Sequence, residues 1–353
     1  MERKKKVFRR IIGGVIGVFV LFSVIAFVVI KIYYDDVFAR TMPGKYTASL
    51  RYEDVSDQYD RELYSFFSGE NKLQGYLYGA SNTKGLIVFS HGIGGGAENY
   101  FAEQLYFVDQ GYQVFCYDNT GCYQSEGENL VGLPQSVIDL DAALTFVESE
   151  PCFEGLPIYL FGHSWGAYAV SSIFNFEGHD IAASVSISGF NCPTTMAVEW
   201  CNNMMGKFLT GILRPYLYLY QRCIFGEALE FTAVGGINNT DTPVLLIHGD
   251  ADETILIDGA ATVAYRDEIT NPKAEVVIWT KEGQNGHNSF FGSVEAHAYL
   301  NELNEEYNAL YQQYNEEIPE NVEREFYAGV DKERASCPDA EFMQMILEFY
   351  EKK

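Results

Sequence analysis

Positively charged residues are scarce over most of this 353-residue sequence. Residues 1–31 contain seven of the 24 Lys and Arg residues and one of the 49 Asp and Glu residues, which leaves a net charge of −31 on the rest of the chain. Nucleic acids and anionic lipid surfaces attract proteins through clustered Lys and Arg side chains. The charge therefore argues against nucleic acid as a partner and is typical of a well-solvated acidic surface.

The sequence also lacks any C-x-x-C pair among its seven cysteines. This absence argues against a zinc ribbon and against a dithiol redox motif. The odd count leaves at least one cysteine free, and a local disulfide is conceivable among Cys192, Cys201 and Cys223, which fall in one segment. Internal repeats and low-complexity tracts are absent as well, so a repeat architecture is not expected.

Charge is missing altogether from residues 11–30, which follow a basic segment at residues 1–10. Twenty uncharged, mostly apolar residues are enough to cross a bilayer as a helix. We expect a cytoplasmic basic tail, a membrane anchor over residues 11–31, a stalk over residues 32–60 and a catalytic domain outside the cytoplasm. The alternative is a cleaved signal peptide, whose apolar region would normally be shorter.

From residue 61 onward, short apolar runs alternate with helical patterns. Residues 63–67 and 73–78 flank a Gly-Glu-Asn turn and predict a hairpin. Further strands are predicted at residues 85–90, 112–117, 158–161, 183–188, 244–248 and 274–279. Strands that alternate with helices predict an α/β fold with a mostly parallel central sheet and helices on both faces. Its two parts would be residues 61–189 and 242–291.

Two segments interrupt this alternation. Residues 190–241 form a connection far longer than usual and carry many apolar and aromatic side chains, among them Trp200, Met204, Phe208 and Leu213. A segment of this composition must pack on something, so we interpret it as a lid over an active site, with an inserted structural helix pair as the alternative. Residues 292–353 are rich in Glu, Tyr and Asn and predict a solvated helical tail.

The sequence Gly162-His163-Ser164-Trp165-Gly166 lies between a predicted strand and a predicted helix. In that context a G-x-S-x-G pentapeptide is a nucleophile elbow, a sharp turn that exposes the serine hydroxyl. The two glycines would be required because a side chain at either position would collide with the neighbouring strand or helix. The alternative is an ordinary turn that contains a serine.

The predicted strand at residues 85–90 is followed by a glycine-rich loop at residues 91–96. Such a loop can offer a backbone N–H to a developing oxyanion. Residues 92–97 also fit G-x-G-x-x-A, a weak dinucleotide fingerprint, and a dinucleotide-dependent reductase therefore remains an alternative. A tight strand-to-helix turn is the simplest alternative.

An acid and a histidine follow the last two predicted strands. Asp252 follows residues 244–248, and His287 follows residues 274–279. A nucleophilic serine needs a base within hydrogen-bond reach and a carboxylate that orients the base. Since the ends of three strands can meet at one edge of a sheet, Ser164, Asp252 and His287 are the candidates, with Asp250 as the rival acid. We expect the side chain of His163 to point elsewhere.

At these motifs the chain resembles the α/β-hydrolases of the monoacylglycerol-lipase and serine-aminopeptidase-like branch. The resemblance implies that Ser164 is the nucleophile, Asp252 the acid and His287 the base. It also implies that the backbone N–H groups of Ile93 and Trp165 form the oxyanion hole. Residues 118–127 depart from the family pattern D-x-R-G-x-G-x-S, since Thr120 and Tyr123 replace its arginine and second glycine, and the geometry of that loop is therefore open.

The sequence thus predicts a membrane-anchored serine hydrolase that cleaves ester or amide bonds and needs no metal or organic cofactor. The alternative is a binding protein on the same fold with an idle triad. An apolar lid would favour neutral or cationic substrates with an apolar acyl portion, and the acidic body would disfavour anionic ones.

Overall fold

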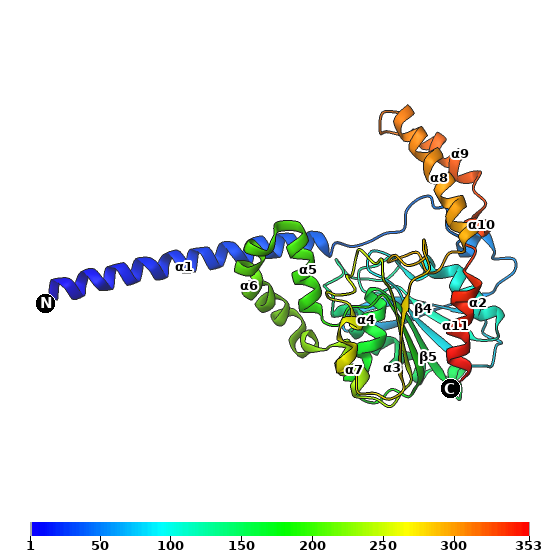
Figure 1. Cartoon of the computed structure of the whole chain (residues 1–353), viewed down its shortest axis with the longest axis horizontal. Helices are drawn as coiled ribbons and strands as arrows, with labels where there is room; N and C mark the ends of the chain where they lie inside the picture. Colours follow the sequence, from blue (N-terminus) through cyan, green and yellow to red (C-terminus); the bar gives the residue numbers. More distant parts are fainter. Residues whose placement is uncertain (1, 353) are drawn as a thin grey trace.

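The structure is a computed structural model that describes residues 2–352. Its centre is an eight-stranded sheet with the strand order β1-β2-β4-β3-β5-β6-β7-β8 (Figure 1). The strands are β1 (Arg61–Ser68), β2 (Asn71–Tyr78), β3 (Leu86–Ser90), β4 (Gln113–Tyr117), β5 (Ile158–His163), β6 (Ile181–Ile187), β7 (Val244–Gly249) and β8 (Ala274–Trp279).

The first two strands form the predicted hairpin, in which Arg61 pairs with Tyr78 and Ser68 with Asn71. Strand β2 also runs antiparallel to β4, whereas every other neighbouring pair is parallel. The parallel strands β3, β4, β5 and β7 are buried along their whole length, which explains their continuous apolar sequences. The mostly parallel sheet predicted from the sequence is confirmed.

Helices cover both faces of the sheet (Figure 1). On one face lie α3 (Gln135–Ser149), α4 (Trp165–Ser172) and α7 (Ala233–Asn238), and on the other lie α2 (Phe101–Asp109) and α11 (Ala340–Glu351). Strand β3 shows the division, because Leu86 and Val88 face the first layer while Ile87 and Phe89 face the second. The parallel strands therefore end at one edge that is free to hold a site.

The C-terminal helix α11 corrects the prediction of a solvated tail. Phe342, Met343, Ile346 and Leu347 are buried in the second layer of the core. Tyr350 is fully buried and donates a hydrogen bond to the Leu160 carbonyl at 2.8 Å. Burial of one such apolar side chain contributes about 1.5–3 kcal/mol, so α11 is part of the folded domain.

The rest of the C-terminal region does project from the body. Helices α8 (Val294–Gln313) and α9 (Glu320–Ala328) form an arm that stands away from the sheet in Figure 1, and the short α10 (Lys332–Ala335) leads back to it. Within α8 the only buried residue is Ala296, and α9 has none. The solvated helical tail predicted from the composition of residues 292–353 is therefore present at α8 and α9, and the prediction is wrong at α11.

The long connection after β6 folds as helices. It contains α5 (Pro193–Met205), α6 (Lys207–Phe225), a 3₁₀ segment (Gly226–Glu230) and then α7. The sequence-predicted helical insertion is therefore present, and it places α5 and α6 beside the N-terminal helix in Figure 1.

The N-terminal helix α1 (Glu2–Val37) is continuous over 36 residues and projects from the body (Figure 1). It is the one helix among residues 2–352 that is long and apolar enough to cross a membrane, a test that a signal sequence also passes. The segment after it does not stand apart as a stalk. Phe38, Leu50 and Val55 are buried against the domain, and Arg40 donates hydrogen bonds to the carbonyls of Tyr123, Ser125 and Gly127.

Candidate active site

Ser164 stands at a sharp turn between β5 and α4. Its backbone has φ 57° and ψ −112°, a conformation that costs a non-glycine residue about 1–3 kcal/mol. A Cβ at Gly162 would lie 2.3 Å from the Gly166 carbonyl oxygen, and one at Gly166 would lie 2.0 Å from that of Ser90. Both glycines are therefore needed for the close approach of strand and helix, as the sequence predicted.

The structure brings the three predicted side chains together at the edge of the sheet. His287 Nε2 lies 2.9 Å from Ser164 Oγ, and His287 Nδ1 lies 2.8 Å from Asp252 Oδ2. Because Nδ1 carries the proton of the neutral ring and donates a hydrogen bond to the Asp252 carboxylate, Nε2 can accept the hydrogen bond of the serine hydroxyl. All three residues are at least nine-tenths buried, so the series is shielded from bulk water.

The acid of this series is Asp252, and its surroundings keep it ionised. The backbone N–H groups of Thr254 and Ile255 each donate to Asp252 Oδ1 at 2.9 Å. Burial alone would raise the pKa of Asp252, but the hydrogen bonds from His287 and from the Ile255 N–H hold that pKa below its ordinary value. The rival Asp250 is exposed and accepts a hydrogen bond from the Asn285 amide instead.

The two predicted oxyanion donors lie in the same cavity as Ser164. Ile93 comes from the glycine-rich loop after β3, and Trp165 is the first residue of α4. Within residues 2–352 neither backbone N–H donates to a protein acceptor. For Trp165 this is usual, because the N–H groups in the first turn of a helix have no partner within the helix. Both donors are therefore available to an oxygen atom in the cavity.

One functional side chain was missed from the sequence. His163 does not point elsewhere: its Nε2–H donates to the backbone carbonyl of His287 at 2.8 Å. The Tyr100 hydroxyl donates to His163 Nδ1 at 2.7 Å and accepts from the Gly92 N–H at 3.1 Å. Burial, and then the neighbouring His287, lower the pKa of His163 to about 3, so it acts as a neutral clamp on the loop that carries His287.

The loop that departs from the family pattern, residues 118–127, has a non-glycine residue in a conformation that favours glycine. Tyr123, which replaces the second glycine, has φ 40° and so adopts the left-handed conformation that glycine normally supplies. Asp118 Oδ1 accepts from the Ala97 N–H at 2.8 Å, and its Oδ2 accepts from the Tyr76 hydroxyl at 2.9 Å. The loop therefore fixes the residues that follow the glycine-rich loop, despite the substitution.

The site opens into a cavity of about 230 Å³. Its walls include Leu133, Phe190 and Ile255 from the core and Trp200 from α5. No Asp, Glu, Lys or Arg side chain lines it, and residues 2–352 contain no cluster of three metal-binding side chains. All seven cysteines are free, including the three for which a local disulfide was conceivable.

The elbow follows β5, and Ser164, Asp252 and His287 follow the ends of β5, β7 and β8 in a mostly parallel sheet. This arrangement is that of the α/β-hydrolase fold, which the chain therefore has. Residues 81–222 match the model of the serine aminopeptidase family S33. This match includes Ser164 and the two predicted oxyanion donors but ends before Asp252 and His287. Only the three-dimensional structure shows that Asp252 and His287 lie beside Ser164.

Individual relatives agree with this assignment. The human monoglyceride lipase (Homo sapiens) is 36% identical over 108 residues, which are 30% of this chain and 35% of that protein. The chain thus spans about a third of the length of this relative. The esterase Pf2001 of Pyrococcus furiosus has the same fold, with a TM-score of 0.51, 16% identity, and coverage of 71% of this chain and 90% of that one. A second crystal form of this esterase gives a TM-score of 0.50 at 18% identity, covering 71% and 88%.

Proposed function

We propose that this chain is a membrane-anchored serine hydrolase that cleaves carboxylic esters, with amides as the less favoured substrates. The observation that carries the proposal is the hydrogen-bonded series from Ser164 through His287 to Asp252, beside two free backbone N–H groups. Three side chains from three strand ends, buried and in this order, are the arrangement that activates a serine for attack on a carbonyl.

The proposed reaction has two steps. His287 accepts the Ser164 proton as the hydroxyl oxygen attacks the substrate carbonyl, and Asp252 stabilises the imidazolium that forms. The N–H groups of Ile93 and Trp165 bind the oxyanion, an effect worth about 3 kcal/mol per donor. His287 then gives its proton to the leaving alcohol or amine. Water repeats the sequence on the acyl-enzyme and releases the carboxylic acid and Ser164.

The cavity supports esters over peptides. The matched family model is named for aminopeptidases, whereas the two relatives are named as a lipase and an esterase. An aminopeptidase must bind the charged α-amino group of its substrate, which a carboxylate does best. Since no acidic side chain lines this cavity, a neutral substrate with an apolar acyl portion fits it better.

The packing of α1 supports a retained anchor. Ala26, Ile30 and Tyr34 lie on one stripe of α1 and are buried, and α1 contacts the lid helix α6. A signal peptide that is removed would leave this face of the lid uncovered. The basic residues before the apolar run favour an orientation with the N-terminus in the cytoplasm and the catalytic domain outside it.

The proposal is tested by comparing the wild-type protein with Ser164→Ala over a panel of p-nitrophenyl acyl esters and aminoacyl p-nitroanilides. We expect the wild type to hydrolyse acyl esters fastest and the variant to hydrolyse none. A folded wild-type protein that cleaves no ester and does not react with a fluorophosphonate would instead support a binding protein with an idle triad. Preference for the anilides would assign an aminopeptidase.

A further inference from the structure

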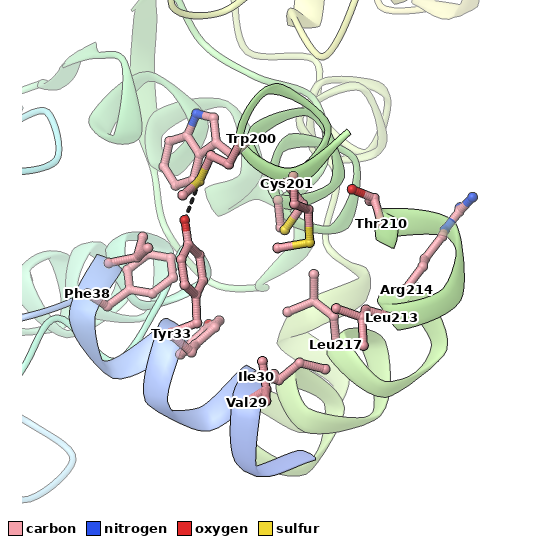
Figure 2. Close-up of a pocket in the computed structure, with 15 residues that line it drawn as sticks. Val29, Ile30, Tyr33, Phe38, Trp200, Cys201, Thr210, Leu213, Arg214 and Leu217 are labelled. Atoms are coloured by element: carbon pink, nitrogen blue, oxygen red, sulfur yellow. Dashed lines mark hydrogen bonds between the residues drawn. The ribbon is translucent and has the colours of Figure 1, made fainter. Parts of the chain in front are cut away.

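A second cavity, of about 290 Å³, lies outside the catalytic site between α1, α5 and α6. In Figure 2, Ile30 and Tyr33 of α1 face Cys201 of α5 and Leu213 and Leu217 of α6 across it. Apolar side chains form nearly all of its lining, and Tyr33 is hydrogen-bonded to the Met204 sulfur at its border. Such a cavity favours a hydrocarbon chain over any polar ligand.

Trp200 belongs to both cavities. Its side chain lines this second cavity between α1, α5 and α6, which we call the α1–lid cavity, and it also lines the cavity that contains Ser164. Phe38 packs beside it, with ring centroids 6.4 Å apart. Each cavity alone is at or below the lower end of the ~300–1,000 Å³ range of small-molecule sites, whereas the two joined would fall within it. The cavity that contains Ser164 therefore adjoins a second apolar space at Trp200.

The α1–lid cavity lies at the C-terminal end of the apolar run of α1, where Val29 and Ile30 line it, and α6 contacts that run farther toward the N-terminus. Phe22 and Phe27 of α1 contact Tyr216 of α6 at centroid distances of 6.0 and 5.4 Å, and Ser23 Oγ lies 3.0 Å from the Tyr216 hydroxyl. Phe22 is eight residues before Ile30, or about 12 Å along a helix. If α1 crosses the bilayer, α6 is immersed in the leaflet next to the catalytic domain.

The exposed surface of α6 fits this position. Phe208 is 85% exposed, and Leu209, Ile212 and Leu219 are exposed as well. Residues 207–225 contain Lys207, Arg214 and Arg222 but no acidic residue, in a chain that is otherwise strongly acidic. A helix with exposed apolar residues and only basic charges is typical of one that lies in a membrane interface.

We propose that the α1–lid cavity binds the hydrocarbon tail of a long-chain acyl ester taken from the bilayer, and that the ester carbonyl reaches Ser164 past Trp200. This inference rests on the proposed function and adds its substrate class, a membrane lipid ester. The anchor helix is then part of the substrate site, because α1 supplies one wall of the cavity. The region matched by the family model, residues 81–222, does not contain that wall.

The direct test uses the wild-type full-length protein in phosphatidylcholine vesicles. A hexadecyl fluorophosphonate with a diazirine at the chain end is allowed to react and is then irradiated, and the crosslinked residues are identified by mass spectrometry. We expect an adduct on Ser164 and crosslinks within residues 29–38 or 197–217. An adduct on Ser164 with crosslinks elsewhere would overturn the inference alone. No adduct on Ser164 would overturn the proposed function and the inference with it.

A matched pair of variants tests the same point by turnover. Cys201→Trp places a large side chain in the cavity, whereas Cys223→Trp makes the same change on an exposed part of α6. We expect Cys201→Trp to reduce palmitoyl ester hydrolysis about tenfold or more, since burial of two methylene groups is already worth about that factor. Acetyl ester hydrolysis should be unchanged in Cys223→Trp, and in Cys201→Trp it should fall much less than palmitoyl ester hydrolysis. Equal effects on the two esters, or equal effects of the two substitutions, would contradict the cavity as a chain site.

The source of the ester is tested by presenting palmitoyl ester either in vesicles or as monomers below its aggregation limit. We expect the full-length protein to hydrolyse the vesicle-bound ester faster. Equal turnover of monomeric ester would overturn delivery from the bilayer.

Discussion

The two cavities that share Trp200 differ in how their walls are held. Around Ser164, hydrogen bonds fix the reacting groups: His287 is bound through both ring nitrogens and through its backbone carbonyl. Around the α1–lid cavity, side chains meet mainly by apolar and aromatic contact, as in the pairs of Phe38 with Tyr34 and with Trp200. Transfer of a proton requires fixed geometry, whereas a hydrocarbon chain requires only apolar space.

The two cavities should therefore affect different properties of the enzyme. Substitutions around Ser164 should change turnover for every substrate, because they alter atoms that react or hold reacting atoms. Substitutions between α1 and the lid should change which substrate is preferred.

Ser164→Ala removes the proposed nucleophile and should reduce turnover of all esters about 10⁵–10⁶-fold, as in other serine hydrolases that lose this group. Its thermal midpoint should stay close to that of the wild type, because the hydroxyl has no structural role apart from its contact with His287. Steady-state hydrolysis of acetyl and palmitoyl esters checks the first point and thermal unfolding the second. Loss of activity for one ester only would contradict the prediction that substitutions around Ser164 affect every substrate.

Asp252→Asn should reduce turnover about 10⁴-fold, because the amide favours the wrong tautomer of His287. Asp250→Asn is the matched control two residues away, where only the contact with the Asn285 side chain changes. It should leave turnover within a fewfold of the wild type. Rates of ester hydrolysis for the pair decide the assignment, and the reverse order of effects would make Asp250 the acid.

His163→Leu should reduce turnover about 10–100-fold without changing chain-length preference, since it releases the loop that carries His287 and a displacement of about 1 Å is costly. His163→Gln retains an N–H donor toward the His287 carbonyl and should recover much of this loss. The acetyl-to-palmitoyl ratio of turnover checks the division. A changed ratio would show that His163 shapes the substrate site instead.

The same His163→Gln variant carries a pH prediction. The pKa of His163 is lowered to about 3, mainly by burial, so between its ordinary value of about 6.5 and 3 the unfolded state binds the additional proton. The wild type should therefore lose stability as the pH falls through that range. Tyr100, His287, Asp252 and His248 surround His163 and remain in the variant. Thermal midpoints measured from about pH 7 to about pH 4 should fall less steeply for His163→Gln, and parallel curves would contradict the prediction.

Removal of residues 1–31 takes away the part of α1 that we propose to span the membrane and, with Val29 and Ile30, part of the cavity wall. The shortened protein should leave the membrane fraction and keep its reaction with a fluorophosphonate. Its preference for palmitoyl over acetyl ester should fall about tenfold. The control replaces residues 8–21 by leucines, which keeps a span and the native contacts of residues 22–37. The preference should be unchanged in this control, and a loss there as well would assign the effect to the span alone.

The group of residues around Ser164 was largely predictable because its sequence signals are local. A serine between two glycines after a strand needs no distant residue to be recognised, and Asp252 and His287 follow the ends of β7 and β8. The parallel sheet then brings these ends to one edge. His163 was missed because its partner, the His287 carbonyl, lies 124 residues away and leaves no pattern in the sequence.

The packing of α1 against α6 was less predictable. The contact of Ser23 with Tyr216 joins residues 193 positions apart, and helix α1 alone shows only that it is apolar. Helix α11 is a different case. Its buried residues Phe342, Met343, Ile346 and Leu347 recur at helical spacing, a signal that the acidic composition of the preceding arm obscured.

The central claim is that Ser164 is a nucleophile activated by His287, and one measurement tests it most directly. The full-length protein is treated with a fluorophosphonate, digested and analysed by mass spectrometry to locate the adduct. The account predicts a single adduct on Ser164, formed much more slowly in His287→Ala and absent in Ser164→Ala. No adduct on the folded wild-type protein, or an adduct on another residue, would contradict it.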